Sequence, residues 1–157
     1  MHFFKRIFFL GLTLSVLQAC NTDNVVVDSF EKIPKETWSY INPIKASVTV
    51  TDSTKAYNIY VNFRHTSDYK YANIWLRFHI IGPNKKDIPL RQEFQLAEAD
   101  GKWLGTGSGN LYNYQLIFKD GYKFPGNGKY TLIVEQNMRD NPLKAISDVG
   151  LYVELAK

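Results

Sequence analysis

The strongest constraint on the fold is an alternation of apolar and polar residues that returns along the chain in short runs. In Ile44–Thr51, isoleucine, alanine and two valines alternate with lysine, serine and threonine. Tyr57–His65 and Asn73–Ile81 alternate in the same way, and the second of them places Trp75 and Arg77 on its polar face. Because successive side chains of a strand point to opposite faces of a sheet, each run predicts a half-buried strand.

Four more segments rich in β-branched and aromatic residues continue this style, and Gly, Pro, Asn and Asp separate them. Pro89 interrupts the first of these, which favours an edge strand. The turn at 52–56 predicts that the strands on either side of it pair with each other in an antiparallel hairpin. The four segments are Asp87–Leu96, Leu111–Phe118, Lys129–Gln136 and Ser147–Leu155.

No segment predicts a long amphipathic helix, and Pro34 limits Phe30–Trp38 to a helical turn at most. Seven or eight strands without a βαβ order predict an all-β fold. We expect a single antiparallel β-sandwich, jelly-roll-like, over residues 29–157. A chain of 157 residues with 45% hydrophobic residues is sufficient for one such core.

The N-terminus differs from the rest of the chain. Two basic residues precede an uncharged apolar run, Ile7–Leu17, which has the length and order of a secretory signal peptide. The following "LQAC" resembles the lipobox of bacterial lipoproteins, in which the cysteine is acylated and becomes the mature N-terminus. We therefore predict a signal peptide at 1–19, lipidation with palmitate at Cys20, and a lipidated tether at 20–28 that either stays extended or forms a first edge strand.

Charge and cysteine content narrow the possible partners. Cys20 is the only cysteine, so the domain cannot depend on disulfides. Cleavage of the predicted leader would remove Lys5 and Arg6 from the 19 basic residues, which leaves 17 basic against 15 acidic residues. A mature charge this close to neutral does not favour nucleic acid, and we expect contact with a membrane through the lipid anchor and no nucleic-acid partner.

Motifs for catalysis and metal binding find no match. The mature chain has two histidines, His65 and His79, whose spacing fits no metal motif, so surface or hydrogen-bonded histidines are expected. No nucleophile elbow opens a helix, and the scattered carboxylates suit solvated faces. We expect no enzyme activity, no cofactor and no metal; a hydrolase would require titratable groups that converge in a pocket.

The segment "GKWLGTGSGN" holds four glycines between two strand-like runs. It lacks the lysine of a phosphate-binding loop, and a tyrosine-rich strand follows it in place of a helix. We interpret it as a structural loop in which Trp103 packs and the glycines let the chain turn or lie close to a neighbour. The glycines concerned are Gly105, Gly107 and Gly109.

The lipobox and three long blocks together resemble the GldH family of gliding-motility lipoproteins of the Bacteroidetes. The blocks are Tyr57–Leu76, Asp100–Tyr114 and Gly128–Glu154, and the resemblance covers nearly the whole chain. It implies a non-catalytic cell-envelope lipoprotein required for gliding, in cells that export adhesins by type IX secretion. Contacts with gliding or secretion proteins would be its mode of action. Only one acidic residue follows Cys20 closely, which favours an outer-membrane position that faces the periplasm.

Two clusters of polar and aromatic residues suggest where a partner binds. One lies between two predicted strands and the other follows the strand that ends at Gln136. A hydrogen-bonded turn is the alternative for the first, and loop-pinning roles for residues of the second. The candidate partner-contact residues are Arg64, His65, Asp68, Tyr69, Tyr71, Asn73, Trp75, Gln136, Met138 and Arg139.

A second function stays open at this point. Exposed aromatic rings can stack on sugars, so the chain could instead be a glycan-binding envelope module. Packing within a sandwich is the competing explanation for the same rings. The rings concerned are those of Tyr69, Tyr71, Trp75, Trp103, Tyr112 and Tyr114.

Overall fold

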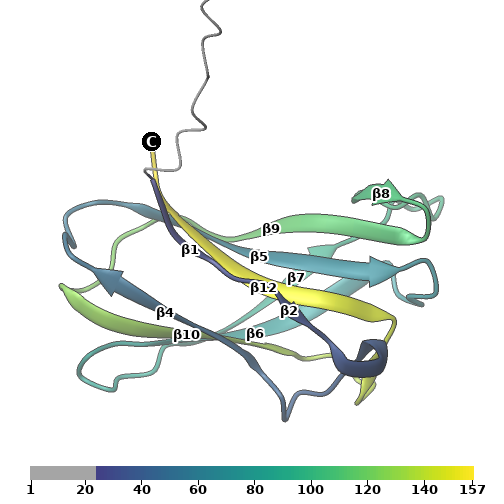
Figure 1. Cartoon of the computed structure of the whole chain (residues 1–157), viewed down its shortest axis with the longest axis horizontal. Coiled ribbons are helices and arrows are strands. Elements are labelled where there is room, and N and C mark those ends of the chain that lie inside the picture. Colours follow the sequence, from purple (N-terminus) through teal and green to yellow (C-terminus); the bar gives the residue numbers. More distant parts are fainter. Residues whose placement is uncertain (1–23) are drawn as a thin grey trace, which may run out of the picture.

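The structure, a computed structural model, describes residues 24–157 apart from the side chain of Ser108, and it confirms the predicted antiparallel β-sandwich. Cys20 and the predicted leader lie outside the described residues. Two sheets pack face to face (Figure 1). Eight strands have four residues or more, in agreement with the seven or eight that the alternation predicts. No helix within 24–157 is long and apolar enough to cross a membrane.

The first sheet has the order β1-β12-β5-β9-β8, and β2 also pairs with β12. All of its pairs are antiparallel. Its strands are β1 (Val25–Asp28), β2 (Glu31–Lys32), β5 (Tyr57–Thr66), β8 (Thr106–Ser108), β9 (Leu111–Tyr122) and β12 (Ile146–Leu155).

The second sheet has the order β4-β10-β6-β7, which confirms the edge position expected for the strand with Pro89. Its strands are β4 (Ile44–Val50), β6 (Asn73–Ile81), β7 (Pro89–Gln95) and β10 (Gly128–Gln136). A small ladder of β3 (Thr37–Trp38) and β11 (Leu143–Lys144) accompanies a 3-10 turn, η1 (Pro34–Glu36), in the segment where a helical turn was expected.

The core lies between the two sheets and comes from alternate residues of each strand. In β5 and β6 every second residue is buried, as the period of a strand requires. The rings of Phe78 in β6 and Phe118 in β9 stack across the core with 3.6 Å between centroids. Burial of one such side chain contributes about 1.5–3 kcal/mol, so packing can hold the domain without disulfides.

The hairpin predicted across residues 52–56 is wrong. β4 pairs with β10, whereas β5 pairs with β12 and β9, so the turn carries the chain from one sheet to the other. Tyr57 enters the core directly after the turn and packs edge-on against Phe124. Alternation fixes which face of a strand is buried, but it does not say which strand lies beside it.

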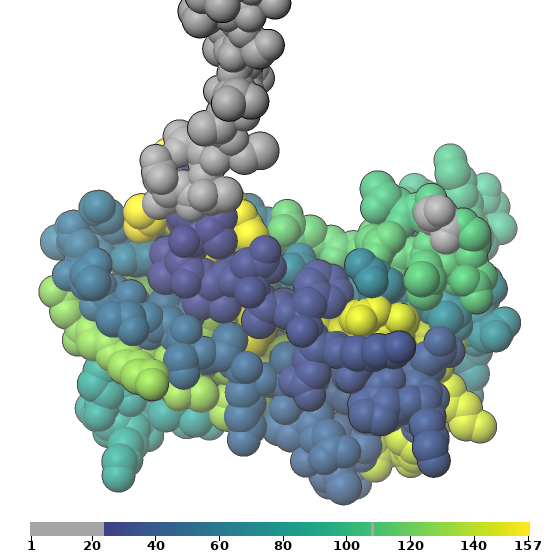
Figure 2. All heavy atoms as spheres, in the orientation of Figure 1, coloured from purple at the N-terminus to yellow at the C-terminus, as the bar shows by residue number. Residues whose placement is uncertain are grey.

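The N-terminal strap, residues 25–32, runs along β12 and lies over the face of the molecule (Figure 2). Its middle is fixed by Ser29, whose N–H donates to the carbonyl of Leu151 at 2.9 Å. The N–H of Leu151 in turn donates to the hydroxyl of Ser29 at 3.0 Å. Here the strap passes over Gly150, where a Cβ atom would lie 1.8 Å from the Ser29 carbonyl oxygen.

The start of β1 and the C-terminus lie at the same end of the sandwich, which we call the anchor end (Figure 1). The N–H of Leu155 donates to Asn24, and that of Ala156 donates to Ala56, both at 2.9 Å. The loops 82–88 and 123–127 belong to this end, because Val50 pairs with Gly128 and Ile81 with Thr131. The loops 67–72, 96–105 and 137–145 lie at the opposite, far end.

Candidate protein-contact surface

His65, one of the predicted contact candidates, is buried in the core. Its exposure is 0% and that of Tyr69 is 4%, so neither side chain reaches a partner in this conformation. The Nδ1–H of His65 donates to the Thr66 carbonyl at 2.8 Å, because that oxygen can only accept. Its ring is surrounded by the rings of Tyr69, Trp103, Tyr112 and Tyr114, at centroid distances of 4.5–5.6 Å.

The same cluster accounts for most of the predicted sugar-binding aromatics. Four of the six rings contact His65 and therefore do not form an open platform. The Tyr114 hydroxyl lies 3.2 Å from Nε2 of His65 and donates to the Leu96 carbonyl at 2.8 Å. Tyr71 and Trp75 are the two that lie outside it, and both are half-buried.

Burial of His65 predicts a dependence of stability on acid. Desolvation lowers the pKa of this imidazole, and the hydrogen bond to Thr66 only partly opposes it. In the unfolded chain His65 should therefore bind a proton near pH 6.5, whereas in the folded protein it should bind one only at a lower pH. We expect the free energy of unfolding to fall as the pH drops below about 6.5. Thermal unfolding at a series of pH values between about 8 and 5 measures this pH dependence.

A His65→Gln variant provides the comparison for that experiment. It cannot take up the proton, so its unfolding temperature should be lower at neutral pH but should depend less on pH in this range. An equal pH dependence in both proteins would contradict the assignment to His65.

The glycine segment forms the wall of this aromatic cluster. A Cβ at Gly105 would lie 2.6 Å from the Tyr114 ring, and one at Gly107 would lie 3.0 Å from the Tyr112 ring. Gly109 has φ +67°, in the left-handed region, at the β8–β9 turn. The segment thus lets β8 approach two tyrosines that flank His65.

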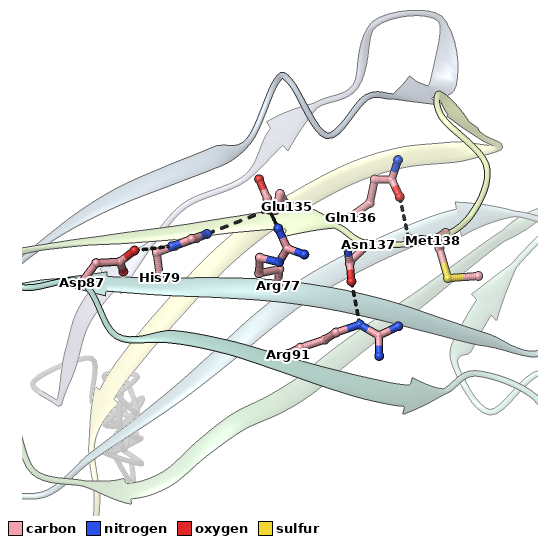
Figure 3. Close-up of polar contacts among 8 residues, drawn as sticks. All are labelled: Arg77, His79, Asp87, Arg91, Glu135, Gln136, Asn137 and Met138. Atoms are coloured by element: carbon pink, nitrogen blue, oxygen red, sulfur yellow. Dashed lines mark hydrogen bonds and ion pairs between the residues drawn. The ribbon is translucent and has the colours of Figure 1, made fainter.

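Gln136, another predicted contact candidate, is also buried, with 0% exposure. Its amide nitrogen donates to the carbonyl of Asp140 at 3.1 Å, and its amide oxygen accepts from the N–H of Met138 at 2.8 Å (Figure 3). Asn141 Oδ1 accepts from the same nitrogen at 3.2 Å. Gln136 therefore fixes the conformation of the loop that follows β10 by hydrogen bonds from the buried side of that loop.

The loops 67–72 and 137–145 meet at the far end. Lys70 pairs with Asp140, and this contact raises the pKa of the amine and lowers that of the carboxylate. Lys70 also lies 4.9 Å from the centroid of the Tyr71 ring. Asp68 and Arg139 are exposed beside them.

Trp75 and Met138 lie together at the junction of β6 and this loop. The N–H of Trp75 donates to the Met138 sulfur at 3.2 Å, and the N–H of Asn137 donates to the Trp75 carbonyl at 2.8 Å. The guanidinium of Arg91 stacks on the Trp75 ring, with Cζ 3.7 Å from its centroid. Nε of Arg91 donates to Asn137 Oδ1 at 2.6 Å (Figure 3).

A row of charged side chains continues along the outer face of the same sheet (Figure 3). Arg77 lies 3.3 Å from Glu135, to which it donates a hydrogen bond. His79 lies between two carboxylates, 2.8 Å from Asp87 and 3.9 Å from Glu135. We call the group Trp75, Arg77, Arg91, Asn137 and Met138 the contact surface.

Two of the predicted contact residues, Arg64 and Asn73, do not belong to the contact surface. Arg64 is on the outer face of the first sheet, where it hydrogen-bonds Asn113 and lies 3.3 Å from Asp148. Asn73 lies at the margin, where its amide donates to Glu93. The predicted contact set is thus divided among two sheet faces, the core and the far-end loops.

Sequence reasoning missed Arg91 and Asn137 as members of this surface. Asn137 stood next to a predicted residue, but Arg91 lies on another strand. Arg77 was already assigned to the face of Trp75, and β7 pairs with β6 so that Arg91 is opposite Arg77. Strand register was the missing information.

The arrangement suits recognition of a protein more readily than chemistry. Trp, Met and Arg are enriched where proteins bind each other, and stacking on an arginine keeps the indole ordered. Among residues 24–157 no three His, Cys, Asp or Glu side chains are grouped so that they could hold a metal ion.

Comparison with known proteins agrees with the resemblance seen in the motifs. The family described as GldH lipoprotein matches residues 25–153. A gliding motility lipoprotein GldH homolog of Christiangramia forsetii is 31% identical over 155 residues, 94% of each chain. The gliding motility lipoprotein GldH of Flavobacterium johnsoniae is 29% identical over 152 residues, 92% of this chain and 93% of its own. The chain therefore belongs to the GldH family of gliding-motility lipoproteins of the cell envelope.

Proposed function

We propose that this lipoprotein acts in gliding without catalysis, by holding its contact surface against another protein of the gliding or type IX secretion machinery. The observation that carries this proposal is the Trp75–Arg91 stack, which Asn137 holds in place on an exposed sheet face. Tryptophan and arginine account for much of the binding energy in protein interfaces, most of all when they are ordered before binding.

The position of the surface supports the same proposal. Lipid on Cys20 would hold the chain at the anchor end, where β1 begins. Trp75 follows the first residues of β6 at the far end, so anchoring leaves it accessible from the periplasm. We propose that the protein is anchored in the outer membrane and faces the periplasm. A partner in the periplasm would then meet the far end first.

An Arg91→Ala variant, alone and combined with Trp75→Ala, tests the proposal. Loss of a central interface residue costs about 2 kcal/mol or more, so recovery of the partner should fall by about 30-fold or more in the double variant. Gliding should fail with it. The measurement is co-purification from cells, with a photo-reactive side chain at position 139 to capture the partner.

Gln115→Ala with Ile117→Ala is the matched control. Both residues are exposed on β9 in the first sheet, away from the contact surface. Gliding that survives the Trp75 and Arg91 changes, in protein that is folded and anchored, would overturn the proposal. Retention on peptidoglycan or polysaccharide, with no protein captured, would instead support the glycan-binding alternative.

A further inference from the structure

The anchor end carries a ring of exposed lysines that the contact surface does not use. They come from four separate segments and the C-terminus, which the pairing of strand ends brings to one end of the sandwich. Within the described chain none of them forms an ion pair with a carboxylate. They are Lys55, Lys85, Lys86, Lys123, Lys129 and Lys157.

Acidic groups at this end are fewer, and most have a partner. Asp87 and Asp120 are exposed, and Asp87 is hydrogen-bonded to His79. Asp52 is held by Thr54, and Glu154 accepts from the hydroxyls of Tyr60 and Tyr152. Six lysines against these four carboxylates leave the side chains of the anchor end with a net charge of +2, because hydrogen bonds from neutral groups do not cancel the charge of a carboxylate.

The far end differs in this respect. Its exposed lysines and arginines are matched by acidic residues in the same loops, and Lys70 is paired with Asp140. The basic members are Lys70, Lys102, Arg139 and Lys144, and the acidic members are Asp68, Glu98, Asp100 and Asp140. Positive charge is thus concentrated at the end where the chain leaves for its lipid.

An apolar pocket of about 330 Å³ opens among these lysines. It lies between the loops 82–88 and 123–127 and is lined by Ile80, Ile88 and Tyr130, with Lys86 among its lining residues. Lys86 lines this opening, and Lys85 and Lys123 belong to the two loops that form it. Amines beside an apolar opening match a lipid, which joins a phosphate to acyl chains, better than they match free phosphate.

The tether limits how far this end can be from the membrane. Five peptide units join Cys20 to Val25, and an extended chain covers at most about 18 Å over that length. The surface potential of the lipids extends over roughly one Debye length of 8–10 Å, and a tether this short lets the lysines of the anchor end come within that distance. We propose that the anchor end binds the anionic phospholipid headgroups of the membrane that holds Cys20.

The inference can be tested on the mature chain, residues 20–157 with Cys20→Ala, because the buried core begins at Ile33. Without lipid, its sedimentation with vesicles reports the headgroup contact alone. It should sediment with vesicles of phosphatidylcholine and phosphatidylglycerol, but not with phosphatidylcholine vesicles, and salt should weaken the binding. Each lysine near the surface contributes about fivefold, so Lys85→Gln with Lys86→Gln should lower partitioning roughly 30-fold.

Lys102→Gln with Lys144→Gln at the far end is the control and should leave partitioning unchanged. Equal losses in the two double variants would overturn the inference, because they would show attraction without a preferred face. Displacement by inorganic phosphate, and not by chloride at equal ionic strength, would also overturn it in favour of a free-phosphate site. In lipidated wild-type protein, Lys85 and Lys86 should be protected from amine acylation by anionic vesicles, while Lys102 stays reactive.

Discussion

A Cys20→Ala variant should lose nearly all of its membrane attachment. Each buried methylene of an acyl chain contributes about 0.8 kcal/mol, and two chains are needed for a stable anchor where one binds only reversibly. The lysines of the anchor end are too few to replace that energy, since each contributes about 1 kcal/mol and salt screens them. Fractionation of cells in a buffer of high salt, which screens the lysines, should show the variant outside the membrane pellet, and gliding should be lost.

The same variant should fold normally, which separates anchoring from stability. The described hydrophobic core extends from Ile33 to Val153. Thermal unfolding of the purified mature chain should therefore not depend on the residue at position 20. Incorporation of labelled palmitate into Cys20→Ala protein would show that the lipobox assignment is wrong, whatever its effect on motility.

The alternation of residues predicted the elements well, because burial of one face is a local property of each strand. β6 begins and ends at the residues expected, and β10 and β12 each begin one residue earlier. The order of the strands in the sheets depends on contacts between distant segments. No local pattern records that β4 lies beside β10, and the compact turn after β4 suggested the wrong neighbour.

The two contact candidates that are buried, His65 and Gln136, show what the residue pattern could have revealed. His65 continues the buried series of Val61 and Phe63 in β5, and Gln136 continues that of Val134 in β10. Their polar character suggested the surface, although their positions indicated the core. A polar side chain is tolerated there when backbone groups satisfy it, as the carbonyls of Thr66 and Asp140 and the N–H of Met138 do.

The two ends of the sandwich divide the work that we propose. Strand ends bring the lysines and the start of β1 to one end, and the loop after β10 brings Met138 to Trp75 toward the other. A tether of a few residues would keep the first end at the membrane. Whether the contact surface keeps a fixed distance from the membrane then depends on how firmly the strap is attached to β12.

Gly150 controls that attachment, because it is the position where the strap passes over β12. A Cβ there would lie 1.8 Å from the Ser29 carbonyl oxygen and 3.1 Å from Cα of Phe30. Backbone atoms cannot rotate away as a side chain can, so the strap has to lift. Lifting it breaks the hydrogen bonds between Ser29 and Leu151, each of which contributes about 1 kcal/mol.

Gly150→Ala should therefore destabilise the domain by about 3 kcal/mol or more, from the three lost hydrogen bonds between Ser29 and Leu151 and the strain of an added methyl group. The unfolding temperature should fall by about 10 °C. Amide exchange at Leu151 should accelerate, and proteases should cut within residues 25–32. Gly126→Ala is the matched control, since a Cβ there meets nothing within 4 Å. An unfolding temperature equal to that of the control would mean that the strap yields freely, and the distance between anchor and contact surface would then be set by the tether alone.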